Sequence, residues 1–291
     1  MSLEQIVLSD DKRGISALQE SVPSNFISRA GDLVLGSPGT VIISTGFYIL
    51  SANASETDGP PGAVAIGNAL NCLGYKVFYV TDKFTTGLMR QSISDPSKVI
   101  DFPIADTFTS HKYSEEILDK LDPSLLISIE RCGPSIDGKY RNMRNKDITA
   151  YTAKIDTMFG MHEKTIGIGD GGNEIGMGNI YDAVSHCDTL VELPTITKTS
   201  ELILSSVSNW GGYGLVADLS MKTGHNLLPS IQKDSEYTKL IVDLGAVDGF
   251  SGKRVYKIDG FDIRDNSAKL ASIHEWSDKN RQPSRENDHL K

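Results

Sequence analysis

The sequence predicts an α/β fold in which a mostly parallel sheet carries helices on both faces, as in a Rossmann-like three-layer sandwich. Short runs rich in β-branched residues alternate along the chain with segments whose apolar residues recur at helical spacing. This alternation is typical of parallel sheets, because a crossover helix connects each strand to the next. The 291 residues, 39% hydrophobic and 23% charged, have the composition of a globular protein.

Five apolar runs have the length and the β-branched content of buried strands. They span residues 40–47, 76–82, 124–130, 164–170 and 188–193. In an open sheet of this kind, ligands bind beyond the carboxyl ends of the strands. Polar segments that directly follow these runs are therefore the candidates for a functional site.

Helical patterns occupy the intervening segments. Residues 60–74 have two prolines at the start and a glycine at the end, as helices commonly do. Residues 114–122 predict a short helix that ends before Pro123. Residues 147–160 have apolar residues at helical spacing behind an aspartate cap, and residues 199–224 predict a helix, a glycine break and a second helix.

A single α/β domain over residues 1–275 is the simplest interpretation, with residues 276–291 as a polar tail that is expected to fray. The net charge of −9 argues against nucleic-acid or anionic-membrane partners. The three cysteines show no metal-binding or disulfide spacing, and the amino terminus has no apolar signal core. We expect a soluble cytoplasmic protein, and a homo-oligomer is compatible with its size, since sheet-based enzymes of this size are often oligomeric.

The segment ETDGPPGA, residues 56–63, follows the first expected strand. Asp58 is well placed to cap the next helix, which is a purely structural role. Its carboxylate is equally a candidate metal ligand at a helix amino terminus, where free N–H groups gather. Both interpretations stay open.

The segment ERCGPSIDGKYRNMRN, residues 130–145, follows the third expected strand. Glu130 ends the strand, and Arg131, Tyr140 and Arg141 are candidates for holding a carboxylate-bearing substrate. The Gly-Pro and Asp-Gly pairs indicate that part of this segment is an ordinary loop.

The stretch TIGIGDGGNEIGMGN, residues 165–179, has six glycines around two acids. Its partial match to the dinucleotide fingerprint is weak, because an acid among the glycines would repel a pyrophosphate, so no nucleotide cofactor is expected. Asp170 and Glu174 offer the hard oxygen ligands that Mg²⁺ or Mn²⁺ takes. The alternative is an Asx-type turn followed by a cap.

Two further glycine-rich segments are candidates for lining a pocket. In SNWGGYG, residues 208–214, Asn209 is the candidate substrate contact, and LGAVDGFSGK, residues 244–253, could close the pocket. The histidines stand in no zincin or serine-hydrolase context.

Taken in order, ETDGPPGA, the ER pair with DGKYRNMR, DGGNEIGMG, SNWGGYG and LLPS resemble the D-glutamate cyclase family over about residues 40–260. The resemblance implies a lyase that converts D-glutamate to 5-oxo-D-proline and water. Larger members carry an additional domain ahead of this one. Some members bind a divalent metal, which agrees with the acid-rich motifs.

Cyclisation requires a base for the α-ammonium and an acid at the γ-carboxylate. We expect Glu130 to be the general base and Asp170 and Glu174 to act in catalysis. The expected metal ligands are Asp58, Asp170 and Glu174. The expected substrate contacts are Arg131, Tyr140, Arg141, Gly171, Gly172, Asn173 and Asn209. A metal-dependent phosphohydrolase and a non-catalytic binder of a small acidic metabolite, such as D-glutamate or 5-oxoproline, remain alternatives.

Overall fold

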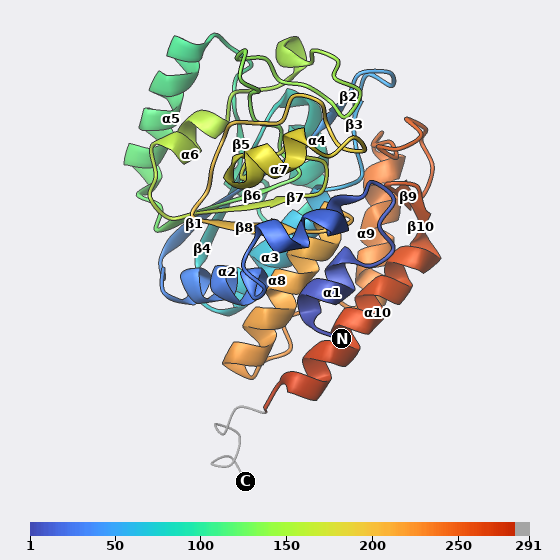
Figure 1. Ribbon diagram of the computed structural model, residues 1–291. Coiled ribbons are helices and arrows are strands. Elements are labelled where there is room, and N and C mark those ends of the chain that lie inside the picture. Colours follow the sequence, from blue (N-terminus) through green and yellow to red (C-terminus); the bar gives the residue numbers. More distant parts are fainter. Residues whose placement is uncertain (283–291) are drawn as a thin grey trace.

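The computed structural model describes residues 1–282 and has a six-stranded parallel sheet at its centre, in the order β5-β4-β1-β6-β7-β8 (Figure 1). This order is that of a doubly wound fold, in which the direction of winding reverses between β1 and β6. The α/β fold class is confirmed. The six strands are β1 (Thr40–Thr45), β4 (Lys76–Thr81), β5 (Val99–Asp101), β6 (Leu125–Ile129), β7 (Thr165–Gly169) and β8 (Glu201–Leu204).

Helices cover both faces of the sheet. Within residues 1–282, the α-helices are α1 (Leu3–Leu8), α2 (Phe26–Leu35), α3 (Pro60–Cys72), α4 (Lys83–Ser92), α5 (Thr107–Leu121), α6 (Asp156–Gly160), α7 (Tyr181–Ser185), α8 (Ser208–Thr223), α9 (Ile231–Asp243) and α10 (Ile263–Asn280). Short 3₁₀ turns cover Ile15–Ser21, Pro96–Lys98, Thr149–Tyr151 and Met177–Ile180, and two small hairpins pair β2 (Tyr48–Ile49) with β3 (Ala54–Ser55) and β9 (Lys257–Ile258) with β10 (Phe261–Asp262).

Alternate side chains of the central strands enter two separate cores. Val41 and Ile43 pack with the helices α2, α3 and α8, while Ile42 between them packs on the opposite side with residues around α5 and α6. This period of two is the geometry of a strand buried on both faces. In Figure 1, α1 and α10 form a further layer outside α8.

Helix α8 runs unbroken through Gly211, Gly212 and Gly214, so the predicted glycine break was wrong. A Cβ on Gly212 would lie 3.0 Å from the Ile129 side chain and 3.2 Å from the Cα of Gly62. The glycines therefore allow α8 to pack closely against α3 and the sheet. Burial on nearly every side outweighs their low helix propensity.

Two other sequence predictions were wrong in the same region of the sheet. Residues 188–193 form no strand, and Val191 instead bonds through its N–H to Gly171 O in a loop. The last strand of the central sheet is β8, formed by residues 201–204, which the sequence assigned to a helix. Short apolar runs fit a strand or a buried helix equally well, and only the pairing of β8 with β7 decides.

The predicted helix over 147–160 is also interrupted. It contains a 3₁₀ turn and α6, and the carbonyl of Ala153 between them accepts a bond from Arg131 at 2.8 Å. Near the carboxyl terminus, α10 continues to Asn280, five residues past the boundary expected at 275, and Ser277 on it is buried. The rest of the expected tail, 283–291, lies outside the described residues.

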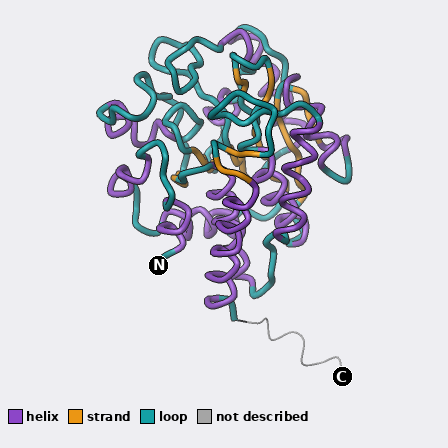
Figure 2. Tube along the Cα trace, turned by 90° about the vertical axis from the view of Figure 1, so that its right-hand side faces the viewer, coloured by secondary structure: helices purple, strands orange, loops and turns teal. Residues whose placement is uncertain are grey.

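Long connections gather in the upper half of the molecule, whereas the lower half is mostly helical (Figure 2). The segments that follow β1, β6 and β7 belong to these connections. Among residues 1–282, no helix combines the length and the hydrophobicity needed to cross a bilayer.

Candidate active site

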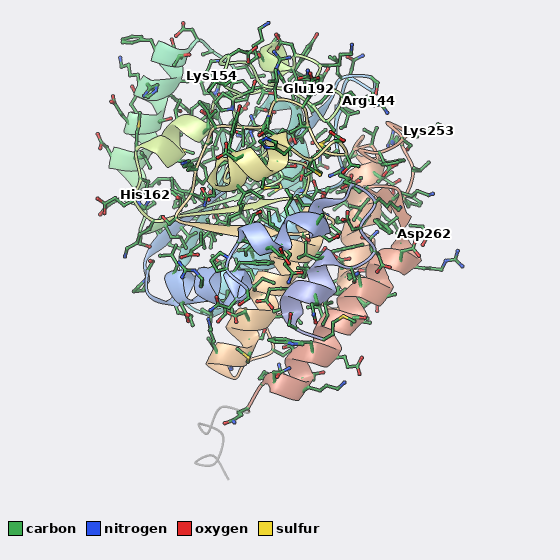
Figure 3. The ribbon with its side chains drawn as sticks, in the orientation of Figure 1. Arg144, Lys154, His162, Glu192, Lys253 and Asp262 are labelled. Carbon is green, nitrogen blue, oxygen red and sulfur yellow. The ribbon has the colours of Figure 1, made fainter. Side chains whose placement is uncertain are left out.

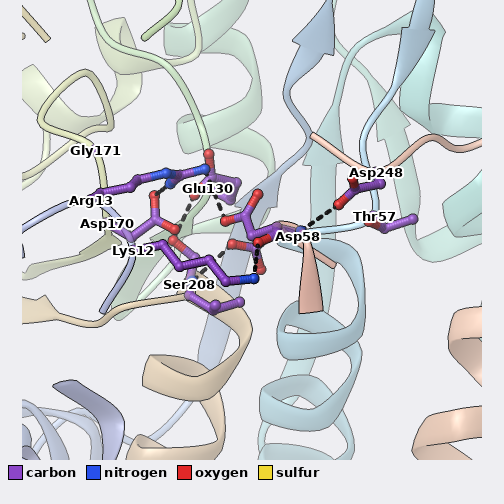
Figure 4. Close-up of polar contacts among 12 residues, drawn as sticks. Lys12, Arg13, Thr57, Asp58, Glu130, Asp170, Gly171, Ser208 and Asp248 are labelled. Carbon is purple, nitrogen blue, oxygen red and sulfur yellow. Dashed lines mark hydrogen bonds and ion pairs between the residues drawn. The ribbon is translucent and has the colours of Figure 1, made fainter. Parts of the chain in front are cut away.

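Carboxylates from several segments meet at the carboxyl edge of the sheet, where the winding reverses. Glu130 directly follows β6, and Asp170 directly follows β7. Asp58 comes after the small hairpin that extends β1, immediately before α3. Figure 4 shows Asp58, Glu130 and Asp170 turned toward one another, with Arg13 beside them. The sequence prediction that distant acids converge here is confirmed for these three and for Glu174.

Asp58 and Asn209 cap each other's helices. The Asp58 carboxylate accepts bonds from the N–H groups of Ser208 and Asn209, both at 2.8 Å, at the start of α8. In return, Asn209 Oδ1 accepts from the N–H groups of Gly59 at 3.0 Å and Gly62 at 2.8 Å, at the start of α3. The positive ends of two helix dipoles therefore point into the acid site.

Arg13 provides a cation within this group of acids. Its guanidinium bonds to Asp170 and forms an ion pair with Asp259 at 2.9 Å. The segment before it is fixed by Asp11, whose carboxylate accepts from the N–H groups of Arg13 and Gly14 at 2.9 and 2.8 Å. Burial opposes the charge of Arg13, but the carboxylates around it, Asp170 first, outweigh that effect and raise its pKa well above the usual range.

The glycine-rich loop folds back over the end of β7 and holds Glu174 in place. The two carboxylate oxygens of Glu174 accept bonds from the N–H groups of Gly171 and Gly172, both at 2.8 Å. A Cβ on Gly169 would stand 2.9 Å from the Glu174 side chain, so only glycine allows this close approach. The glycines thus shape a nest around a carboxylate of the protein itself.

Glu130 combines backbone strain with burial. Its φ of 47° is uncommon for a residue with a side chain, and such strain concentrates at functional sites. Its Oε2 accepts a bond from Ser208 Oγ at 2.6 Å. Burial, followed by repulsion from Glu174 and Glu56, raises the pKa of Glu130 well above its usual range.

Other acids of the site are perturbed in the same direction. Burial is the main cause of the raised pKa values of Glu56 and Asp170, and Asp259 adds to both. For Asp58, burial and Asp259 raise the pKa to about 8 against the N–H bonds from Asn209 and Ser208. The site thus concentrates negative charge that protons or cations must balance.

Two groups of buried carboxylates could each hold a metal ion, and Asp170 belongs to both. Its oxygens lie within 4.8 Å of those of Asp58 and Asp259 in one group, and of Glu130 and Glu174 in the other. Asp170 Oδ2 and Asp259 Oδ1 are buried without a hydrogen-bond partner among the described residues. Hard oxygen donors with unused lone pairs fit a divalent cation such as Mg²⁺ or Mn²⁺.

A cavity of about 530 Å³ opens beside these acids. Glu56, Glu130, Arg13 and Asn173 lie along it, and Arg144 and Lys146 line its outer part. Figure 3 labels Arg144 among the loops on the upper part of the molecule. The segment around Asp248, which the sequence suggested as a closing element, also lines the cavity through its residues 249–252.

Three expected substrate contacts are engaged elsewhere. Arg131 is buried and bonds to Asp82 at 2.7 Å, and Arg141 bonds to Asp137 at 2.5 Å. Tyr140 donates its hydroxyl to Asp156, inside a small apolar cluster. Three others lie at the site but already bond within the protein. The N–H groups of Gly171 and Gly172 donate to Glu174, and Asn209 Oδ1 accepts from the N–H groups at the start of α3.

Sequence reasoning missed Arg13, Glu56 and Asp259. Arg13 stands in a charged amino-terminal stretch, and Asp259 in an Asp-Gly pair that resembles a plain turn. Glu56 lay within a quoted motif but received no role. The left-handed backbone of Asp259, with φ of 50°, becomes visible only in the structure.

In doubly wound α/β folds, a cavity at the winding reversal lined by buried polar groups is typical of a site that binds a small molecule. Residues 3–274 match the family model described as D-glutamate cyclase-like, C-terminal, so the chain belongs to this family. The chain is also 26% identical to the human protein named D-glutamate cyclase, mitochondrial, with 82% of this chain aligned. The alignment covers 46% of that relative, so the chain spans about half of its length.

Proposed function

We propose that this chain is a lyase that cyclises D-glutamate to 5-oxo-D-proline with loss of water, assisted by Mg²⁺ or Mn²⁺. The observation that supports the proposal most directly is the convergence of Asp58, Glu130, Asp170 and Glu174 beside one cavity. The family membership and the name of the human relative supply the reaction.

Glu130 is the proposed general base. It lines the cavity, Ser208 fixes one of its oxygens, and its raised pKa brings its basicity closer to that needed for removing a proton from the α-ammonium. The ammonium would lie between Glu130 and Glu56, which face the same space. That placement brings the nitrogen near the γ-carbon only when the substrate is folded back on itself.

The carboxylate of the substrate needs cations that line the cavity and are not already paired with acids of the protein. Arg131 and Arg141 bind Asp82 and Asp137, so we now assign the substrate carboxylate to Arg144 and Lys146. Asp170 would hold the metal ion with Asp58 and Asp259, because the other group, with Glu174, contains the proposed base Glu130. When bound there, a divalent cation supplies a Lewis acid that polarises a carboxylate oxygen.

The test is chiral mass-spectrometric detection of 5-oxo-D-proline from D-glutamate, with EDTA or with Mn²⁺. Glu130→Gln should lose at least a hundredfold in kcat, since general-base catalysis contributes about 10² to 10⁴. Its thermal midpoint should not drop, because a neutral amide relieves repulsion. Glu115→Gln, on the exposed side of α5, is the matched control. Full turnover by Glu130→Gln would contradict the assignment, and no conversion by the wild-type protein with Mn²⁺ would contradict the function.

A further inference from the structure

The cavity is larger and more apolar than D-glutamate requires. Its volume of about 530 Å³ lies within the range of roughly 300–1,000 Å³ that holds drug-sized ligands, whereas glutamate is a small and wholly polar molecule apart from two methylenes. The acids Glu56 and Glu130 line part of the cavity together with Arg13, and this part is called the acidic side. Five apolar side chains also line the cavity and are called the apolar wall: Phe47, Ile49, Leu50, Met143 and Phe250.

Phe250 is the most unusual member of this wall, because 57% of its surface is exposed. It lies in the loop that Asp248 orders by accepting from the N–H groups of Ser251 at 2.9 Å and Gly260 at 2.7 Å. The loop is therefore held in place while it presents a phenyl ring at the edge of the cavity. An aromatic ring that lines a cavity offers a bound ligand a large apolar surface.

We propose that this chain also acts on γ-D-glutamyl dipeptides whose second residue is apolar. The glutamyl part would occupy the acidic side, and the second side chain would cover the apolar wall. Of the two exposed cations that line the cavity, Arg144 and Lys146, one would bind the α-carboxylate of the glutamyl part and the other the carboxylate of the second residue. The inference rests on the proposed cyclisation, since it keeps the same ring closure.

The chemistry balances without water or another reactant. The neutral α-nitrogen forms a bond to the γ-carbon, and the bond from that carbon to the amide nitrogen breaks. One proton passes from the α-nitrogen to the departing nitrogen, which leaves as the amine of the second amino acid. The products are 5-oxo-D-proline and a free amino acid, and nothing is oxidised or reduced. A neutral amide is also a better electrophile than the ionised carboxylate of glutamate.

The test compares γ-D-glutamyl-L-leucine, γ-D-glutamyl-glycine and D-glutamate with the same purified protein and Mn²⁺. Release of the amino acid and of 5-oxoproline is followed by mass spectrometry. We expect kcat/KM for the leucine dipeptide to exceed that for the glycine dipeptide by at least tenfold, because apolar pockets discriminate missing methylenes by about 10- to 200-fold. Phe250→Ser should lower this ratio at least fivefold.

Phe108→Ser is the matched control, since Phe108 is 80% exposed and lies on α5, away from the cavity lining. It should leave the ratio unchanged. Turnover of D-glutamate without release of leucine would overturn this inference alone. Absence of turnover with all three substrates would overturn the proposed function together with it. Equal rates for the two dipeptides, unaffected by Phe250→Ser, would refute the role of the apolar wall.

Discussion

The metal-free protein should lose stability as the pH rises from 6.5 to 8. The pKa of Asp58 is about 8 in the folded protein, against 3.8 ordinarily, because of burial and then Asp259. A carboxyl with a raised folded-state pKa contributes fully below its unfolded pKa and loses that contribution as the pH rises through its folded pKa. At about 1.4 kcal/mol per pKa unit, Asp58 alone would account for roughly 1–2 kcal/mol across this window.

The raised pKa values of Glu56, Glu130 and Asp170 act with the same sign and steepen the loss. The window starts at 6.5 because two acids outside the site, Asp218 and Asp234, have pKa values of about 6. The stability that these two acids contribute is therefore largely lost below pH 6.5, before the window begins.

The assay is urea unfolding in EDTA, followed by tryptophan fluorescence, at four pH values between 6.5 and 8. Glu130→Gln removes one of the titrating carboxyls and should flatten the dependence, whereas Glu115→Gln should not. Saturating Mn²⁺ should stabilise the protein more at pH 8 than at pH 6.5, since it binds the ionised acids. A free energy of unfolding that stays constant or rises with pH would refute the picture of a proton-loaded acid cluster.

Three further substitutions, one of them a control in helix α4, test the framework around the site. Arg131→Met should lower the free energy of unfolding by about 3–5 kcal/mol, because it leaves Asp82 as an unpaired buried charge; a loss below 1 kcal/mol in urea titrations would argue against a structural role for this arginine. Gly169→Ala should lower the free energy of unfolding by about 1–3 kcal/mol, because the added methyl overlaps with Glu174. Gly87→Ala in helix α4 has nothing within 4 Å of the added methyl and should raise the free energy of unfolding by about 0.5–1 kcal/mol. A higher thermal midpoint for Gly169→Ala than for Gly87→Ala would contradict the close packing at Gly169.

The sequence predicted the α/β class and most central strands because buried parallel strands are continuous β-branched runs. It failed at residues 188–193 and 201–204, where short apolar runs carry no periodicity that separates strand from helix. The glycines of α8 misled for a related reason. These glycines allow α8 to contact α3 closely, and the helix propensity of a residue contains no information about a neighbouring helix.

Four acids of the site, Asp58, Glu130, Asp170 and Glu174, were predictable because their segments follow predicted strands, and parallel strands end at one edge. Glu56 and Asp259 were missed. The positions of the cations were not predictable. Arg131 stands next to Glu130 in sequence, yet its side chain lies in a separate buried network with Asp82. Arg13 is more than a hundred residues from Asp170 and comes from a segment outside the sheet altogether. Charge pairing of this kind depends on tertiary placement, which spacing in the sequence does not encode.

The exchange of caps between Asp58 and Asn209 constrains how a ligand reaches the site. Asp58 follows β1, which is the first central strand along the chain, and Asn209 follows β8, which is the last. Separating the start of α3 from the start of α8 would break the bonds of four backbone N–H groups at once, those of Gly59, Gly62, Ser208 and Asn209. The contact between these two segments is therefore a fixed part of the site, and a ligand reaches the acids through the cavity that residues 142–146 and 249–252 help to line.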